Sequence, residues 1–513
     1  MAKTVFNDIP SKGKGIRFIL AIAAIILILP LMRLAPWQDK GIINPDAVIM
    51  LPNYYMNGMV FQREKTIHVK GTTEAGTRLE ITIGDNARSS SATTVADDNG
   101  IFTANLETPP ARLEAYSLTV SSGNNTLLTI AEVYVGDVFL AAGQSNMEAN
   151  YYDYYKSSKK TDSINSSNLP SAISNPNVHF IVASHVSSSH AESRSSNIPL
   201  RSYCSKKWLT ATGTNSDFLG YLPQFFAEHL SKKNTNIPIG IIQTAWSGTS
   251  ISQHLDNGKI YNTHIAPLKD FSIAGILWYQ GETDAIYDLD SYRYLYNFAL
   301  LIQQYRQLFN DEDLPFLFVQ LARYSDNRNT TIIRQAQLDV LSIIQHPETV
   351  AMTVSIDTDK GTQDNIHPLG KDILGTRMAD QWVAMSLHTQ IPSGPIIDKA
   401  RSARQGTSAS ISFTKHTAQD LHVMSPIRNL SASPQHYAVH TSNQISGFEA
   451  AGSDGVFHKA TATVNEDDTL TITSKGVDHI QQVRYLWSNS PQEQTLLYNK
   501  WNLPASPFVI DVS

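Results

Sequence analysis

The pattern of apolar and polar residues divides the chain into three stretches after its first 40 residues. From about residue 41 to 135, short runs such as Thr66–Gly71 and Leu79–Gly84 alternate apolar and polar positions between turn-forming residues. This alternation is typical of strands with one buried face, and it predicts a β-sandwich-like region. The same character returns from residue 396 to 513, in runs such as Leu470–Thr473, and predicts a second β region.

The middle stretch, residues 136–395, alternates apolar strand-like runs with helical patterns. The runs that predict buried strands are Val138–Ala142, Val178–Ala183, Ile237–Gln243, Ile273–Tyr279, Phe316–Leu321 and Val350–Ile356. The helical patterns are Tyr221–Leu230, Tyr292–Phe309 and Ile332–Ile344. This alternation predicts an α/β fold with a doubly wound, mostly parallel sheet.

Polar segments follow several of the predicted strands. They include Ser145, Trp246–Ser250, Gln280–Asp284 and Asp364–His367. Ligands bind at the carboxyl ends of the strands in such sheets, so we expect these segments to converge at one edge.

The first 40 residues form a separate segment. Three basic residues, Lys12, Lys14 and Arg17, precede an apolar run, Phe18–Met32. A cleaved secretory signal and an uncleaved signal-anchor both fit this pattern. We favour the signal-anchor because Arg33 and the residues after it do not form a small-residue cleavage site. Either interpretation predicts an exported protein, periplasmic or extracellular, whose membrane contact is limited to this segment.

Composition narrows the possible functions. The chain has 513 residues, a hydrophobic fraction of 42% and a net charge of -6, without a long basic run outside the N-terminal segment. These features argue against a nucleic-acid partner. The single cysteine, Cys204, rules out a disulfide framework within one chain, and the sequence has no metal-binding spacing. We therefore expect no metal and no other cofactor. Nothing in the sequence indicates an oligomeric state.

The strongest chemical signal is a serine with a distant Asp–His pair. Ser145 lies in Gly143–Met147, directly after a predicted strand, and Asp364 precedes His367 by three residues in a short polar loop. In a Ser-His-Asp arrangement the histidine takes the serine proton and the aspartate orients the imidazole. Activity should then rise with pH through an apparent pKa of roughly 6 to 7, the ordinary range of histidine.

Several further blocks resemble one family. They are Gly58–Gln62, Val135–Phe139, Gly143–Met147, Pro238–Ile242, Gly248–Ile251, Trp278–Asp284, the Asp364/His367 pair, Arg484–Trp487 and Leu503–Phe508. In this order they resemble the sialate O-acetylesterases, a branch of the SGNH/GDSL hydrolases, over nearly the whole chain after residue 48. The resemblance implies a flavodoxin-like catalytic domain and hydrolysis of acetyl esters on sugars through an acetyl-serine intermediate.

The oxyanion of such a reaction needs hydrogen-bond donors. The Ser145 and Gly248 backbone amides are candidates, and the resemblance places a side-chain amide at Gln280. We expect Glu282 to support the site structurally. Relatives commonly have glycine where this chain has Ser247, which could alter the acyl or sugar pocket.

The substrate and two details stay open. The resemblance implies an O-acetylated sialic acid as the partner, and an acetylated plant polysaccharide such as xylan is the alternative. A non-catalytic carbohydrate-binding protein is a third hypothesis, which the intact Ser145, Asp364 and His367 disfavour. The aromatic cluster Tyr151–Tyr155 could stack on sugar rings or pack within its own loop.

Overall fold

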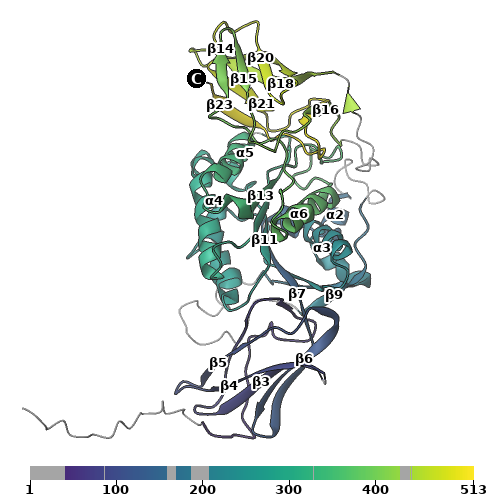
Figure 1. Ribbon diagram of the computed structural model, residues 1–513, viewed down its shortest axis with the longest axis vertical. Coiled ribbons are helices and arrows are strands. Elements are labelled where there is room, and N and C mark those ends of the chain that lie inside the picture. The colour runs from purple at the N-terminus through teal and green to yellow at the C-terminus, as the bar shows by residue number, and fades with distance from the viewer. Residues whose placement is uncertain are drawn as a thin grey trace, which may run out of the picture. The chain divides into compact units, whose positions relative to one another are not determined.

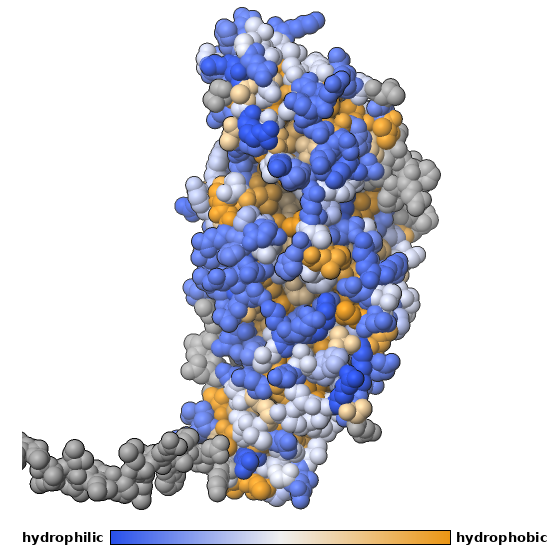
Figure 2. Space-filling view, viewed as in Figure 1, coloured by the Kyte–Doolittle hydropathy of each residue, from blue (hydrophilic) through white to orange (hydrophobic). Residues whose placement is uncertain are grey.

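The structure, a computed structural model, describes residues 41–85, 87–158, 169–185, 207–326, 328–427, 439–440 and 442–512. The predicted N-terminal signal segment and Cys204 lie outside these residues. Residues 41–513 form one compact unit. Across its described part, none of the helices is both long and apolar enough to cross a membrane. On the face shown in Figure 2, apolar residues reach the surface in separate patches between hydrophilic ones.

The central sheet confirms the predicted α/β fold. Its strands lie in the order β13 (Val350–Thr353), β12 (Phe316–Val319), β11 (Gly275–Tyr279), β7 (Asn125–Gly143), β10 (Ile239–Gln243), β8 (Asn175–Val182) and β9 (Leu209–Ala211). All pairs are parallel except β8 with β9. The chain builds β8 and β10 on one side of β7 and then crosses to build β11, β12 and β13 on the other. The carboxyl end of β7 is therefore the point at which such a sheet binds ligands.

Helices cover both faces of this sheet (Figure 1). They are α1 (Ser145–Glu148), α2 (Tyr151–Ser158), α3 (Tyr221–Lys233), α4 (Asp288–Leu308), α5 (Thr330–Asp339) and α6 (Lys371–Ser386). Phe139 on β7 packs against Phe226 of α3 and Trp382 of α6. Trp278, whose side chain points to the opposite face of the sheet, stacks on Phe298 of α4. Helices α3, α4 and α5 correspond to the predicted helical patterns, whereas α6 was not predicted.

The N-terminal β region joins the central sheet through β7. Its other strands are β1 (Val60–Gln62), β2 (Ile67–Thr72), β3 (Arg78–Gly84), β4 (Ser89–Val95), β5 (Ile101–Leu106) and β6 (Arg112–Ser122). The first half of β7 pairs with β6, and its second half pairs with β10 and β11. One 19-residue strand therefore crosses the boundary we placed between residues 135 and 136. It provides a direct backbone connection where a linker would otherwise be expected.

The C-terminal region is a β region, as predicted, and its strands pair antiparallel. One sheet has the order β14 (Ala403–Gln405), β15 (Ser408–Ile411), β20 (Leu470–Thr473), β19 (Phe457–Val464), β18 (Gln444–Ala451), β21 (Gln482–Tyr485) and β23 (Phe508–Asp511). A smaller sheet contains β17 (Val439–His440), β16 (His422–Met424) and β22 (Leu496–Tyr498).

The segment Asn502–Phe508 leads into the last strand of the chain. Pro504, Ala505 and Ser506 are buried, and the Ser506 hydroxyl accepts a hydrogen bond of 2.7 Å from Gln320, just after β12. The tail then continues into β23, which pairs with β21. The prolines therefore mark a buried connection to the last strand of a sheet.

Candidate active site

Ser145 lies at a sharp strand-to-helix turn at the end of β7. Gly143 has a φ of +124°, and a Cβ atom there would lie 2.3 Å from the Tyr279 carbonyl oxygen of the neighbouring strand. Only glycine fits this close approach. The Gln144 N–H donates a 2.9 Å hydrogen bond to the same carbonyl. The next residue, Ser145, begins α1 with its side chain 7% exposed.

Two backbone amides at this turn are available to a ligand. The Trp246 N–H donates to the Gly143 carbonyl over 3.0 Å, so the segment after β10 lies beside the turn. Within the described part of the chain, the N–H groups of Ser145 and Gly248 donate to no protein acceptor. Gly248 is exposed with a φ of +73°, and open space surrounds the position of a Cβ. Free amides beside a serine hydroxyl are what an oxyanion requires.

Gln280 is held more tightly than these amides. It is fully buried directly after β11, and its Nε2 lies within hydrogen-bond distance of Thr249 O at 3.0 Å, Gln144 Oε1 at 3.2 Å and an Asp284 carboxylate oxygen. An amide nitrogen has only two protons, so both are committed to internal acceptors. Gln280 stays a predicted third oxyanion donor, and it would have to exchange one of these acceptors for the oxyanion.

The loop that carries His367 lies beside α1. Asn146 Nδ2 donates to the Ile366 carbonyl over 2.9 Å, which joins the residue after Ser145 to the residue before His367. Burial, with a smaller contribution from the nearby Lys371 cation, lowers the pKa of His367 to about 4, and Glu148 opposes the shift. An acidic limb set by His367 would therefore lie below the pH 6 to 7 that we expected, because that expectation neglected burial and Lys371.

Asp364 is exposed on this loop. Among the described residues, no hydrogen bond joins its carboxylate to the His367 ring, and none joins that ring to Ser145. Its role as the residue that orients His367 stays a prediction. Hydrogen bonds between catalytic groups often tighten only in the complex with substrate, so the separation does not rule out that role.

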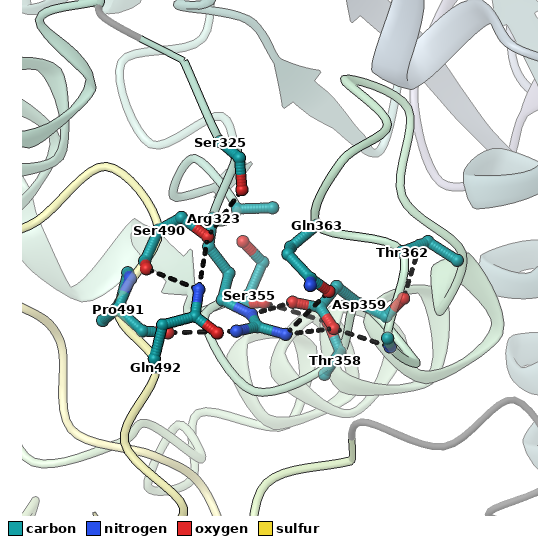
Figure 3. A network of polar contacts seen from close by, with 12 residues as sticks. Arg323, Ser325, Ser355, Thr358, Asp359, Thr362, Gln363, Ser490, Pro491 and Gln492 are labelled. Carbon is teal, nitrogen blue, oxygen red and sulfur yellow. Dashed lines mark hydrogen bonds and ion pairs between the residues drawn. The ribbon is translucent and has the colours of Figure 1, made fainter. Parts of the chain in front are cut away.

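The same loop is anchored by a buried ion pair, Arg323–Asp359 (Figure 3). Arg323 also donates to the Pro491 carbonyl over 3.0 Å, which connects the C-terminal region to the loop. Beyond Asp359, the Thr362 hydroxyl donates to the Asp359 carbonyl and accepts from the Leu369 N–H over 2.9 Å. These contacts span the segment that holds Asp364 and His367, so the loop is fixed at both ends.

A wall of polar and aromatic groups that was not predicted borders the turn. Glu148 accepts from the Ser247 N–H at 2.7 Å and hydroxyl at 2.6 Å, and its other oxygen lies 2.7 Å from His185 Nε2. The His185 ring stacks on Trp246 with centroids 4.4 Å apart. The exposed Lys259 places its Nζ 4.4 Å from the Trp246 ring centroid. This wall presents a cation and an indole beside Gly248.

Two features left open by the sequence now have defined positions. Glu282 is mostly buried and accepts a hydrogen bond from Asn146 Nδ2, so its carboxylate contacts the residue after the nucleophile candidate. In the aromatic cluster, Tyr154 is buried and donates to the Pro368 carbonyl over 3.2 Å, which is a packing role. Tyr152 is 39% exposed and packs beside Phe218.

Comparison with known proteins agrees with this geometry. A family model described as a carbohydrate esterase, sialic acid-specific acetylesterase, matches residues 135–384. Over this stretch the chain is similar to that family. The sialate O-acetylesterase of Homo sapiens is 23% identical over 94% of this chain and 95% of its own length. That of Mus musculus is 22% identical over 90% and 94%.

A solved structure extends the comparison to three dimensions. A carbohydrate acetylesterase from Xanthomonas citri superposes with a TM-score of 0.73 at 27% identity, covering 91% of this chain and all of that protein. The predicted family, the SGNH-type fold and the class of carboxylic ester hydrolase are confirmed. Together the comparisons support a carbohydrate esterase.

Proposed function

We propose that the esterase removes acetyl groups from O-acetylated sialic acid by a serine mechanism at the carboxyl end of β7. His367 takes the proton of the Ser145 hydroxyl as its oxygen attacks the acetyl carbon. The bond to the sugar oxygen breaks, and this oxygen receives the proton from His367. Water, deprotonated by His367, then attacks the acetyl carbon of the acetyl-serine. The bond to the Ser145 oxygen breaks, this oxygen takes the proton back from His367, and acetate leaves. Asp364 holds the imidazole in the required tautomer.

The unpaired amides of Ser145 and Gly248 carry this proposal. The Ser145 amide lies at the turn and the Gly248 amide in the adjacent segment after β10, and in the described part of the chain neither would have to break a protein hydrogen bond to stabilise an oxyanion. The low pKa of His367 supports it too, because the imidazole is then neutral and able to accept a proton throughout the physiological pH range. Every proposed proton transfer uses side chains of the chain itself.

Lys259 favours an anionic sugar. Its ammonium lies over the Trp246 ring, and the carboxylate of Glu148 on the same wall is already bound by Ser247 and His185. A sialic acid carries a carboxylate that such a cation can attract, and a neutral xylan does not. The Xanthomonas citri relative is described only as a carbohydrate acetylesterase, so an acetylated neutral polysaccharide is the second candidate.

Acetate release from matched substrates tests this choice. We expect a higher kcat/KM for O-acetylated sialic acid than for its carboxyl methyl ester or for acetylated xylo-oligosaccharides. Lys259→Gln should lower kcat/KM for the acid about fivefold, the effect of losing an exposed charge pair of roughly 1 kcal/mol. It should leave the methyl ester unaffected.

Lys269→Gln, at another exposed lysine ten residues further along, is the matched control and should change neither rate. Equal loss on the acid and the methyl ester in Lys259→Gln would contradict carboxylate recognition. Faster hydrolysis of the xylo-oligosaccharides by the native enzyme would select the second candidate.

We also propose that the esterase region works outside the cytoplasm. The support is the basic flank before Phe18 and the apolar run after it. The test adds protease to cells whose outer layer has been removed or made permeable while the inner membrane stays closed. The protease should digest the esterase region while a cytoplasmic marker survives. Protection of the region until the inner membrane is opened would refute export.

A further inference from the structure

The polar atoms of the Asn146 side chain are all engaged in one buried network. Asn146 directly follows Ser145 and is 2% exposed. Its Nδ2 donates to the Ile366 carbonyl and to Glu282, and its Oδ1 accepts a 2.9 Å hydrogen bond from Lys371 Nζ. This asparagine therefore bridges the helix that begins with Ser145 and the loop that carries His367.

Lys371 completes the bridge from the other side. It is the first residue of α6 and is 2% exposed. Its Nζ donates to the Pro368 carbonyl over 2.8 Å as well as to Asn146. The Pro368 carbonyl follows His367 directly, and the Ile366 carbonyl precedes it. The two carbonyls that flank His367 are thus held by a pair of side chains in direct contact with each other.

Holding a cation at the buried position of Lys371 is energetically unfavourable. Burial lowers its pKa to about 7, although the carboxylates of Glu282 and Asp372 act in the opposite direction. The start of a helix also carries positive partial charge, which disfavours a cation. Such a buried cation is tolerated only where hydrogen bonds compensate it, and here they come from Asn146 and the Pro368 carbonyl. The groups that hold the lysine are therefore the ones that fix the loop of His367.

We propose that Lys371 is a positioning residue that, together with Asn146, holds the loop of His367 against the helix that begins with Ser145. The inference rests on the proposed roles of Ser145 and His367. The charged groups that face His367 are Lys371 and Glu148, and those that face Lys371 are His367, Glu282 and Asp372. Lys371 is the cation among them, so its removal both loosens the loop and changes the protonation of the base.

The test is Lys371→Met, which keeps the length of the side chain and removes its charge. We expect kcat per active site to fall about 10- to 100-fold, the usual result of a small misplacement of a catalytic group. KM should change by less than about threefold. The acidic limb of the pH profile should move to higher pH, because the pKa of His367 rises when a neighbouring cation is lost. Covalent labelling by a fluorophosphonate counts the active sites.

Lys360→Met is the matched control. Lys360 lies in the same loop, and its Nζ pairs with Asp372 at 2.9 Å rather than with the carbonyls on either side of His367. The acidic limb of the pH profile and the kcat per labelled site of Lys360→Met should match those of the native enzyme. Lys371→Arg, which keeps the charge, should keep the native midpoint of the limb.

Native kcat per labelled site with an unmoved limb in Lys371→Met would overturn the inference. If that variant does not fold, Asn146→Ala takes its place, and a native kcat per labelled site there would overturn the inference equally. Both outcomes leave fluorophosphonate labelling of Ser145 intact, so they are distinct from failure of the proposed function. That failure would appear as a native enzyme that is not labelled at Ser145.

Discussion

Ser145→Ala is expected to lose hydrolysis of a simple acetyl ester by about 10⁴- to 10⁶-fold, because a serine and its base act as a unit. The remaining activity would come from the free Ser145 and Gly248 amides, which the substitution retains. Removing one hydroxyl from Ser145, a residue that is 7% exposed, should leave the fold intact. Initial rates of acetate release and the thermal unfolding curve measure both quantities.

Ser342→Ala serves as the control for serine substitution, because Ser342 is exposed and its hydroxyl donates to the Asp339 carbonyl three residues earlier. This variant should hydrolyse the ester and accept a fluorophosphonate label like the native enzyme, whereas Ser145→Ala should do neither. A folded Ser145→Ala protein that turns over near the native rate would rule out the serine mechanism.

The strands were predictable because a strand buried on both faces is a continuous run of apolar residues in the sequence. The run Ile273–Tyr279 became β11, with every residue of Gly275–Tyr279 buried. Helix α6 leaves no comparable apolar pattern. Its buried residues include Lys371, Arg377 and Gln381, which are polar and obscure the helical period of the apolar residues around them. Tertiary hydrogen bonds compensate for burying these side chains.

The candidate site was predictable only in part, because some of its contacts join residues that are far apart in the sequence. The turn at Ser145 depends on local sequence, since Gly143 permits a backbone approach that no other residue allows. The bridge from Asn146 to Lys371 spans 225 residues and has no local pattern. The wall of Trp246, Lys259 and His185 likewise forms only when separate loops meet. Such contacts depend on the assembled sheet edge.

The pKa of His367 depends on its surroundings as well as on its residue type. A histidine near an aspartate should have an ordinary or raised pKa, yet the pKa of His367 is lowered to about 4. Burial disfavours the imidazolium, and Lys371 repels it. Neither effect is visible from the spacing of Asp364 and His367, because both depend on groups that the fold places around the ring.

Asp364→Asn is expected to lower kcat by about 10⁴-fold, the effect of losing the carboxylate that fixes the tautomer of a catalytic histidine. A carboxylate beside His367 stabilises the imidazolium, so its removal should lower the pKa of His367 further and move the acidic limb to lower pH. Rates measured across the pH range, corrected for the number of labelled active sites, give both quantities. Because Asp364 is exposed, the substitution should not affect thermal unfolding.

Glu148→Gln and Glu282→Gln test whether another carboxylate has the role proposed for Asp364. Glu148 raises the pKa of His367 through its charge, so Glu148→Gln should also move the limb to lower pH. Its carboxylate is bound to Ser247 and His185, so we expect its kcat to fall by at most about 100-fold. Glu282 contacts Asn146 and should affect the rate through the position of the loop. If Asp364→Asn keeps the native rate and midpoint, Asp364 does not orient the base. The catalytic carboxylate would then be whichever of Glu148 and Glu282 shows the 10⁴-fold loss, and it would act from the helix of Ser145 or from the end of β11.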